Sequence, residues 1–451
     1  MTLDASLLRR GIAFQQHLAG AGRKMTEKGR LSLARTLKNT NPFYARLYKD
    51  ADCADWTALP PIDKKTVMEH YDALIAPSGW SRQRLEAFFA GGFALERTPD
   101  PGHLAFHSSG SSGSMSISLY SAFAFGRSIA AFHARAIAGH THKAPRLAYI
   151  GMTDRFNGGN QWIHFMAGLM PVALYSIFSD PEEIIEDLCD FDPTIMLTKP
   201  HALIALAQAA LKRGRRLKPA RLLSVGENLT AHARESILAL YGTLPHNSFS
   251  TTETGPIGFQ GDSRHEALDL YDTLNFVEIL DEAGRPIEQA GREGIVTVSS
   301  LYNTAMPLMR YRLGDIACWL DEGDGGIRRL SFIGKRGNTV LTFSIRGKCV
   351  RINESALWNL SFPGVCDYRI VQISPSALRI DAAADPAGPP DEDAVIARLA
   401  TAIADAGCAP VPDIHFRQVK RIEPDARTAK IKRVIPLKGD ASSPLIAGSE
   451  K

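Results

Sequence analysis

A run of seven serine and glycine residues, 108–114, lies deep inside the chain between the strand-like stretches "LAFH" and "ISLYS". Glycine lets the backbone approach a ligand closely, successive backbone N–H groups can surround an anion, and serine hydroxyls add donors. A phosphate-binding loop and an ordinary polar turn both fit these residues. A Walker A loop is excluded, because it requires a lysine and a following helix and this run has neither.

Four further segments carry residues that suit the same chemistry, in order along the chain. "LLSVGENLT" (222–230) ends a strand-like run in Gly-Glu, and "HNSFSTTETGPIG" (246–258) places an aromatic residue, threonines and an acid on one loop. "MPLMRYRLGDIACWL" (306–320) joins Arg-Tyr-Arg to Gly-Asp, and "ARTAKIKRVI" (426–435) is rich in lysine. Each has an ordinary interpretation alone: a helix-start carboxylate, a surface acid, a turn or a solvated lysine. The combination favours one shared site.

The segments that must position these loops alternate between strands and helices. Apolar spacing predicts helices over residues 5–50, and a Pro-Pro turn followed by Asp63 predicts a helix N-cap there. Short strands and helices then alternate over residues 104–330, which is typical of α/β sheets. A short helix, two strands, a helix and a strand follow. We therefore predict an α/β protein with domains 1–337 and 338–451.

Composition excludes several classes of protein. The chain has 451 residues, 45% hydrophobic and 22% charged, which indicates an ordinary soluble protein of two or three structural units. A net charge of +4 spread along the chain is unlike the basic stripe of a nucleic-acid-binding protein. No apolar run is long enough to span a membrane, and the N-terminus lacks a signal-peptide pattern. The scattered cysteines favour reduced thiols over disulfides or zinc, so we predict a cytoplasmic protein.

Taken together, the motifs resemble the adenylate-forming enzymes, and within them the phenylacetate–coenzyme A ligase-like branch. "SSGSSGSMS" stands at the place of that family's phosphate loop, and "SVGENL", "FSTTE", "RYRLGD" and "RTAKIKR" resemble its later motifs in order. The resemblance covers most of the chain and is specific for family, not for substrate. It implies a large N-terminal adenylation domain of mixed sheets and helices, followed by a smaller, mobile α+β C-terminal domain.

The resemblance also implies a reaction. A small carboxylic acid would react with ATP and Mg²⁺ to give an acyl-AMP and pyrophosphate, and the acyl group would then pass to a thiol, expected to be that of coenzyme A. An amine or a carrier protein is the alternative acceptor, and a nucleotide-binding relative without turnover is the alternative protein. Whether the protein is a homodimer stays open, and no nucleic-acid or membrane partner is expected.

Residue roles follow motif by motif from the same resemblance. Lys430 would bridge the α-phosphate and the substrate carboxylate, Thr252 would donate to the α-phosphate, and Glu253 would hold Mg²⁺. The serine-rich loop would hold the β- and γ-phosphates, and later motifs would hold adenine and ribose. The residues assigned to nucleotide binding are Ser108, Ser109, Gly110, Ser111, Ser112, Gly113, Val225, Gly226, Glu227, Phe249, Ser250, Thr251, Asp315 and Lys335.

An aromatic cluster suggests where the acyl group binds. Phe156, Trp162 and His164 lie in "DRFNGGNQWIHFMAGLM", which follows a strand and should begin a helix. They predict a pocket for an aromatic carboxylic acid, with packing in the core as the alternative for each ring.

The sequence departs from the family pattern at several motif positions. Ser114-Met115 replace the usual Lys-Pro of the phosphate loop, which leaves one phosphate charge without its cation. Ser250 and Ala429 replace motif glycines, and the hinge expected near Gly337-Asn338 lacks its acids. Residues 255–281 contain a histidine but no cysteine, so no structural metal is expected there.

Overall fold

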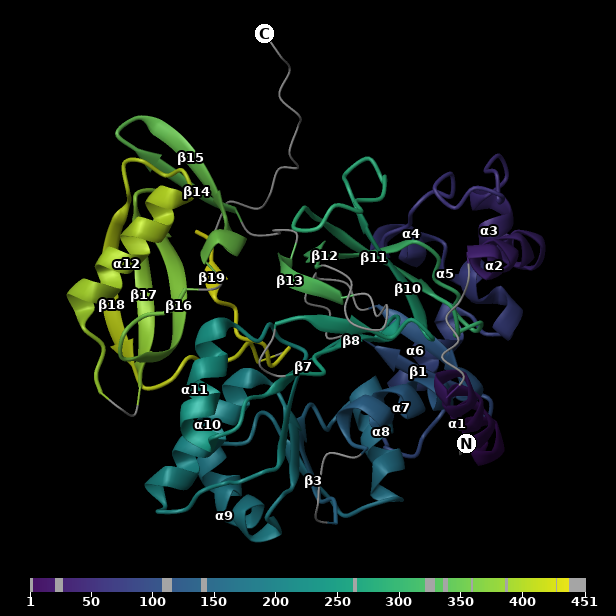
Figure 1. Cartoon of the computed structure of the whole chain (residues 1–451), viewed down its shortest axis with the longest axis horizontal. Coiled ribbons are helices and arrows are strands. Elements are labelled where there is room, and N and C mark those ends of the chain that lie inside the picture. Colours follow the sequence, from purple (N-terminus) through teal and green to yellow (C-terminus); the bar gives the residue numbers. More distant parts are fainter. Residues whose placement is uncertain are drawn as a thin grey trace. The chain divides into compact units, whose positions relative to one another are not determined.

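The structure is a computed structural model, drawn in Figure 1, and it describes residues 3–20, 27–107, 116–138, 144–262, 266–320, 329–335, 340–357, 360–385, 388–426 and 428–437. It divides into two compact units. The N-terminal unit is Met1–Glu227 with Tyr241–Ile333, and the C-terminal unit is Asn228–Leu240 with Gly334–Lys451. The predicted boundary after residue 337 and the hinge at Gly337-Asn338 fall in 336–339, outside the described residues, and stay predictions.

The N-terminal unit is built on one mixed sheet. In the described part of the chain its eleven strands have the order β10-β11-β12-β13-β9-β8-β7-β6-β5-β3-β4. Strands β4, β3, β5, β6 and β7 are mutually parallel, and β7, β8 and β9 are antiparallel. A separate antiparallel pair joins β1 to β2. The strands are β1 (His103–His107), β2 (Ile117–Ser121), β3 (Leu147–Gly151), β4 (Val172–Ser176), β5 (Ile195–Thr198), β6 (Arg221–Val225), β7 (His246–Thr251), β8 (Gly255–Phe259), β9 (Leu268–Leu270), β10 (Asn275–Leu280), β11 (Glu293–Ser300), β12 (Tyr311–Trp319) and β13 (Arg329–Lys335).

Helices precede the sheet and connect its parallel strands. Central strands such as β3 and β5 are buried along their whole length, as expected of parallel strands covered on both faces. None of the described helices is long and apolar enough to cross a membrane. The helices are α1 (Ala5–Gly20), α2 (Glu27–Thr40), α3 (Pro42–Leu47), α4 (Lys64–Glu69), α5 (Tyr71–Ile75), α6 (Arg82–Ala90), α7 (Ala122–Ala136), α8 (Gly158–Ala167), α9 (Pro181–Phe191), α10 (Pro200–Lys212) and α11 (Ala231–Tyr241).

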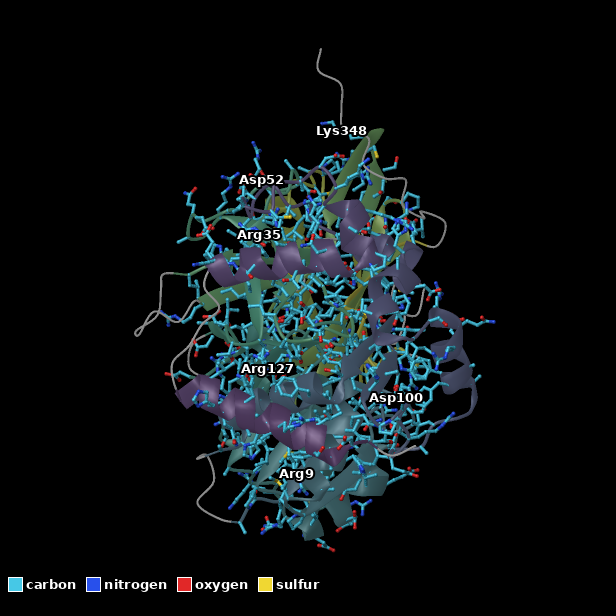
Figure 2. The ribbon with its side chains drawn as sticks, turned by 90° about the vertical axis from the view of Figure 1, so that its right-hand side faces the viewer. Arg9, Arg35, Asp52, Asp100, Arg127 and Lys348 are labelled. Atoms are coloured by element: carbon cyan, nitrogen blue, oxygen red, sulfur yellow. The ribbon has the colours of Figure 1, made fainter. Side chains whose placement is uncertain are left out.

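Two glycines allow helices α1 and α7 to pack closely. A Cβ on Gly126 of α7 would collide with the backbone carbonyl of Leu8, and one on Gly11 of α1 would collide with that of Phe123. Beside this contact, Arg127 Nε donates to Gln15 Oε1 at 3.2 Å, and Figure 2 labels Arg127 near α1. Burial lowers the pKa of the Arg127 guanidinium to about 10. The first helix is therefore fixed to the unit by backbone contact and a buried polar network.

The C-terminal unit has its own sheet and its own core. Strands β18-β17-β16-β19 form a four-stranded sheet, and β14 pairs with β15 in a hairpin. Val395, Leu399 and Ile403 of α12 are fully buried against this sheet, and Figure 1 shows the helix running along it. Its elements are β14 (Val340–Ile345), β15 (Lys348–Asn353), β16 (Val365–Ser374), β17 (Ala377–Ala384), α12 (Glu392–Asp405), β18 (Asp413–Val419) and β19 (Val434–Ile435).

The predicted α/β class with a large mixed sheet is confirmed. The local sequence patterns predicted some individual elements correctly and others incorrectly. Asp63 is the N-cap of α4, and its side chain accepts from Thr66 N as predicted. The short helix predicted after residue 352 is only a 3₁₀ turn at Glu354–Leu357. The hairpin β14–β15 is missing from the prediction. The sequence left open whether "ARTAKIKRVI" is a hairpin or a loop, and the described residues before β19 form a loop.

Candidate active site

The turn between β7 and β8 holds Thr252 and Glu253 in a fixed conformation. Thr254 N donates to Thr251 Oγ1 at 3.1 Å, and the two threonine hydroxyl oxygens are 2.9 Å apart. Gly255 has φ +69°, and a Cβ there would collide with the phenol oxygen of Tyr302. Only glycine therefore fits directly after the threonine-rich motif.

Side chains from other elements hold this turn by its backbone. Tyr120 donates to Thr252 O at 3.1 Å, and Tyr302 donates to Thr254 O at 3.0 Å. Burial raises the pKa of both phenols, so they stay protonated and remain donors. These two hydrogen bonds fix the backbone of the turn, and the one from Tyr120 connects the turn to β2.

A hydrogen bond connects Glu253 to the base of the serine-rich run. Ser116, the described residue just before β2, donates from Oγ to Glu253 Oε1 at 2.8 Å and is almost fully buried. Strands β1 and β2 pair in register His107↔Ile117, so the run is the connection of a hairpin. Its predicted phosphate-binding residues, Ser108–Gly113, lie outside the described residues, as does Ser114-Met115.

Asp315 lies in an irregular part of β12. Ile316 pairs with Ile295 and Arg312 with Thr297, so residues 313–315 form a bulge, and Gly314 within it has φ +79°. Bulges redirect side chains and recur beside active sites. Asp315 is buried, and its charge, together with that of Glu253, acts on the nearby phenol of Tyr311. Burial is the largest cause of the raised pKa of Tyr311, and the carboxylates of Glu253, Asp63 and Asp315 add to it in that order. Glu253 and Asp315 therefore share one neighbourhood.

The residues predicted to contact adenine divide between two strand ends. Phe249 of β7 packs against Phe332 with ring centroids 5.6 Å apart, and a register shift separates it from the exposed Ser250. Val225 ends β6, and the exposed Gly226 follows it with φ +74°. Since β6 and β7 are parallel neighbours, their carboxyl ends lie together, where α/β sheets bind ligands.

Glu227 belongs to a cluster of charged groups that the sequence did not reveal. His201 Nδ1 lies 2.8 Å from Glu227 Oε2, and both side chains are nearly buried. Lys199, which follows β5, is only 8% exposed and feels the Glu227 charge. A lysine before a helix-starting proline gives no sequence signal of a site. Only the structure shows that Lys199 adjoins Gly226 at the end of the neighbouring strand β6.

The three residues predicted to line the acyl pocket differ in their surroundings. Phe156 is buried among Phe88, Phe89 and Phe93, with centroid distances of 4.9, 5.4 and 5.1 Å. Its carbonyl accepts from the backbone N of His107, so this cluster lies where β1 ends and the serine-rich run begins.

The two residues on α8 contrast with each other. Trp162 is buried with its ring edge-on to Phe132 at 5.1 Å, and its Nε1 has no partner among the described residues. His164 is exposed. Their contact with a substrate stays a prediction.

Lys430 lies in a tight loop of the C-terminal unit that Asp425 organises. Asp425 Oδ1 accepts from the backbone N and the hydroxyl of Thr428, both at 3.0 Å, and Asp425 Oδ2 is 2.8 Å from Lys432 Nζ. The backbone N of Asp425 donates to the Lys430 carbonyl at 2.9 Å. Ala429 is buried with φ +51°, which explains why a glycine suits this position in the family that the sequence resembles.

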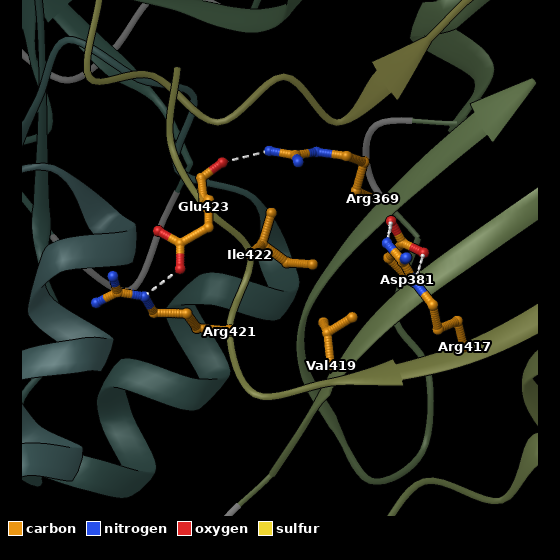
Figure 3. Close-up of a pocket in the computed structure, with 7 residues that line it drawn as sticks. All are labelled: Arg369, Asp381, Arg417, Val419, Arg421, Ile422 and Glu423. Atoms are coloured by element: carbon orange, nitrogen blue, oxygen red, sulfur yellow. Dashed lines mark hydrogen bonds and ion pairs between the residues drawn. The ribbon is translucent and has the colours of Figure 1, made fainter. Parts of the chain in front are cut away.

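A cavity in the C-terminal unit is charged but separate from these residues. Figure 3 shows its lining, which is Arg369, Asp381, Arg417, Val419, Arg421, Ile422 and Glu423. Asp381 is bound by Arg417 at 2.7 Å and by Arg379, and Arg421 Nε lies 2.5 Å from Glu423. Burial would raise the pKa of Asp381, but the two arginines hold it below its usual value. The cavity carboxylates are therefore already neutralised, and none of the predicted site residues lines it.

The donors near Glu253 suit Mg²⁺ better than a transition metal. Among the described residues no group of three or more histidine, cysteine or acidic side chains could hold a metal ion. Mg²⁺ commonly takes one or two protein carboxylates and fills its other positions with water and phosphate oxygens. A single carboxylate bonded to Ser116, beside the predicted phosphate-binding run, fits that pattern. Lys335 lies at the end of β13, and its side chain is outside the described residues.

Several supporting residues were missed by sequence reasoning. Ser116 was the easiest to find, since it follows the serine-rich run directly. Tyr120 and Tyr302 belong to separate segments of the chain, and their residue types alone indicate ordinary core residues. No local pattern indicates that tyrosines so far apart in sequence share one turn.

Solved structures share this fold along nearly the whole chain. A 2-hydroxyisobutyryl-CoA ligase in the postadenylation state with 2-HIB-AMP has a TM-score of 0.63 at 17% identity, covering 96% of this chain and 90% of that one. The same ligase with 2-HIB-AMP and CoA in the thioesterification state has a TM-score of 0.53 at 18% identity, covering 96% and 89%. The amide bond synthetase McbA from Marinactinospora thermotolerans has a TM-score of 0.52 at 17% identity, covering 94% and 92%. The sequence itself matches no family model and no curated protein.

Proposed function

We propose that the protein activates a carboxylic acid with ATP, forming an acyl-AMP and pyrophosphate, and then transfers the acyl group to an acceptor. The observation that carries this proposal is the 2.8 Å hydrogen bond from Ser116 to Glu253, because it joins the proposed phosphate loop to the proposed metal carboxylate. The shared fold of the CoA ligase and the amide bond synthetase supports it.

The described residues divide the work of the first step. The acid and ATP are both anionic, so catalysis must come mainly from positioning and charge neutralisation. Thr252 is held by Tyr120 beside Glu253, where its groups would donate to the α-phosphate. Asp315 would accept the two ribose hydroxyls, and Phe249 with residues 225–227 would surround adenine. Lys430 would offset the charge that develops between the carboxylate and the α-phosphate.

Glu253 would hold Mg²⁺, which would neutralise phosphate charge when bound. The Ser116 hydroxyl donates to one carboxylate oxygen and so fixes the orientation of the other. The serine-rich run would supply backbone N–H groups to the β- and γ-phosphates, in part replacing the absent lysine.

For the acceptor we favour the thiol of coenzyme A, and for the acid an aromatic carboxylate within the phenylacetate–CoA ligase-like branch. The buried aromatic cluster around Phe156 supports the aromatic acid. An amine is the second candidate acceptor, because the fold is also that of an amide bond synthetase.

Pyrophosphate release tests the first step. Purified protein with ATP, Mg²⁺ and a panel of aromatic and aliphatic acids should release pyrophosphate with at least one acid and none without acid. Acyl-adenylate captured with CoA, hydroxylamine or amines in parallel would then identify the acceptor. Glu253→Gln, which removes the charge proposed to bind the metal, is the matched variant and should lose most activity. ATP binding without pyrophosphate release for any acid would instead favour a nucleotide-binding protein without turnover.

A further inference from the structure

Lys199 is a buried cation placed where two parallel strands end. It follows Thr198, the last residue of β5, and its carbonyl accepts from the backbone N of Ala202 and of Leu203, both at 3.1 Å. These bonds anchor the residue at the start of α10. Its side chain is only 8% exposed, although lysine is almost never buried without a partner.

The ammonium group reaches toward the end of β6. Nζ lies 3.5 Å from the point where Gly226 would carry a Cβ. A Cβ at 226 would be in van der Waals contact with the ammonium, and the positive φ of Gly226 disfavours a larger residue. Lys199 thus adjoins the strand end that we assign to the nucleotide and acyl site.

The Lys199 ammonium group has no hydrogen bond or ion pair to any other residue within the part of the chain that the structure describes. The charge of Glu227 acts on the ammonium, and the Glu227 carboxylate lies 2.8 Å from His201 Nδ1. Burial lowers the pKa of the lysine, and the Glu227 charge opposes that effect only in part. A desolvated cation without a bound acceptor is costly, and an apolar side chain would fill the same space without that cost.

We propose that Lys199 Nζ binds a second anionic group on the acyl substrate, so that the preferred acid is a dicarboxylate or an equivalent dianion. This inference rests on the proposed adenylation reaction. Sheet order favours the acid over the triphosphate: Glu253 follows β7, whereas Lys199 follows β5, so the two strand ends are two strands, or about 10 Å, apart. The AMP measurement below tests the remaining possibility, that the ammonium contacts the nucleotide near Gly226. On its other side β5 adjoins β3, which leads into the segment of Phe156 and Trp162. A phosphate near Glu253 and an acyl group extending toward β3 would place the far end of the acid at Lys199.

The test compares matched acids by a measurement that needs no turnover. Isothermal titration calorimetry would measure binding of benzoate, isophthalate and terephthalate, and of AMP, to the full chain. The proteins are the wild type, Lys199→Met, Lys199→Arg and Lys218→Met. Lys218 is an exposed lysine of the same unit and serves as the control. Circular dichroism would check that each variant is folded.

We expect the wild type to bind at least one dianion about 10- to 100-fold more tightly than benzoate, the range for a hydrogen bond to a charged group. Lys199→Met should lose that preference, while Lys199→Arg keeps most of it and Lys218→Met keeps all. AMP affinity should be unchanged in every variant.

Several results would overturn the inference: equal binding of mono- and dianions by the wild type, no binding of either dianion, loss of preference in the arginine variant, or weaker AMP binding in Lys199→Met. Pyrophosphate release measured on the same acids separates the two proposals. Equal pyrophosphate release with monoanionic and dianionic acids would contradict only the role of Lys199. Selective dianion binding without pyrophosphate release contradicts only the adenylation reaction.

Discussion

At the scale of single residues, the proposal depends most on Lys430. Lys430→Ala should lower acyl-AMP formation by about 100-fold or more, because the lysine would offset charge that develops only in the transition state. ATP affinity should stay within a few-fold. Rapid-quench measurement of acyl-AMP, with nucleotide binding measured separately, distinguishes the two effects. The control is Lys420→Ala, an exposed lysine of the same unit, which should behave as wild type. Normal adenylation by Lys430→Ala would remove this assignment.

Ser116 provides a second test at this scale. Ser116→Ala removes the donor to Glu253 and should lower kcat/KM for ATP by about 10- to 100-fold, as loss of a hydrogen bond to a charged group does. Ser118, two residues further on and within β2, is fully buried, and its hydroxyl has no partner among the described residues. Ser118→Ala is therefore a matched control that should leave activity unchanged. Equal effects of both substitutions would show that β2 tolerates neither and that Ser116 has no special role.

At the scale of elements, the loop that carries Lys430 depends on the charge of Asp425. The hydrogen bond from Lys432 lowers the pKa of Asp425, burial opposes this, and the bonds from Thr428 lower it further. A lowered folded-state pKa means that the stabilisation is complete above the usual aspartate pKa of about 4 and is lost as the pH falls below it.

Urea unfolding of Asp425→Asn tests this relation. The variant should be less stable than wild type at pH 7, and the difference should shrink as the pH falls toward 3. Asp405→Asn, at an exposed position that ends α12, should show no such pH-dependent difference. A difference for Asp425→Asn that is constant with pH would mean that the carboxylate charge does not organise the loop.

The contact between α1 and α7 gives a prediction about stability alone. Gly126→Ala would force a Cβ into the backbone of Leu8, which cannot yield as a flexible side chain would. We expect a loss of about 1–3 kcal/mol in the free energy of unfolding, the usual range for overpacking. Gly20→Ala is the control, since a Cβ there meets no atom within 4 Å. Unchanged stability of Gly126→Ala would mean that α1 moves away freely.

At the scale of the whole molecule, the proposed chemistry requires both units. Glu253, Asp315 and Lys199 belong to the N-terminal unit and Lys430 to the C-terminal unit, each with its own core. The proposal therefore predicts that the C-terminal unit moves to the site during the reaction. The separate cores allow such motion without loss of either fold.

Hydrogen exchange can follow that movement in the full chain. AMP alone should slow exchange at the ends of β6 and β7 and in β12. A non-hydrolysable acyl-adenylate mimic of an accepted acid should in addition slow exchange over residues 428–432, because the loop would then contact the ligand. In Lys430→Ala the protection over residues 428–432 should be reduced, and the protection of β6, β7 and β12 should be unchanged. Protection that never extends beyond Ile333 would contradict a role for the C-terminal unit in the first step.

The sequence alone was enough to predict the α/β class and the order of the motifs. Strand and helix periodicities are local, and so are cap signals such as Asp63. The threonine-rich turn, the Gly-Asp of β12 and the lysine segment could be recognised for the same reason, since each is a short run of fixed residue types. The hairpin β14–β15 was missed even though Leu341, Phe343 and Ile345 alternate with polar residues in β14.

Only the tertiary structure decided which side chains support these motifs. The bond from Ser116 to Glu253 joins residues 137 positions apart, and Lys199 meets Gly226 only because β5 and β6 are neighbours in the sheet. Strand order is set by the packing of the whole unit, so no single segment of the sequence indicates it. For the same reason the burial of Lys199 and Asp315 could not be predicted from their residue types. Polar side chains are expected at the surface unless distant elements cover them.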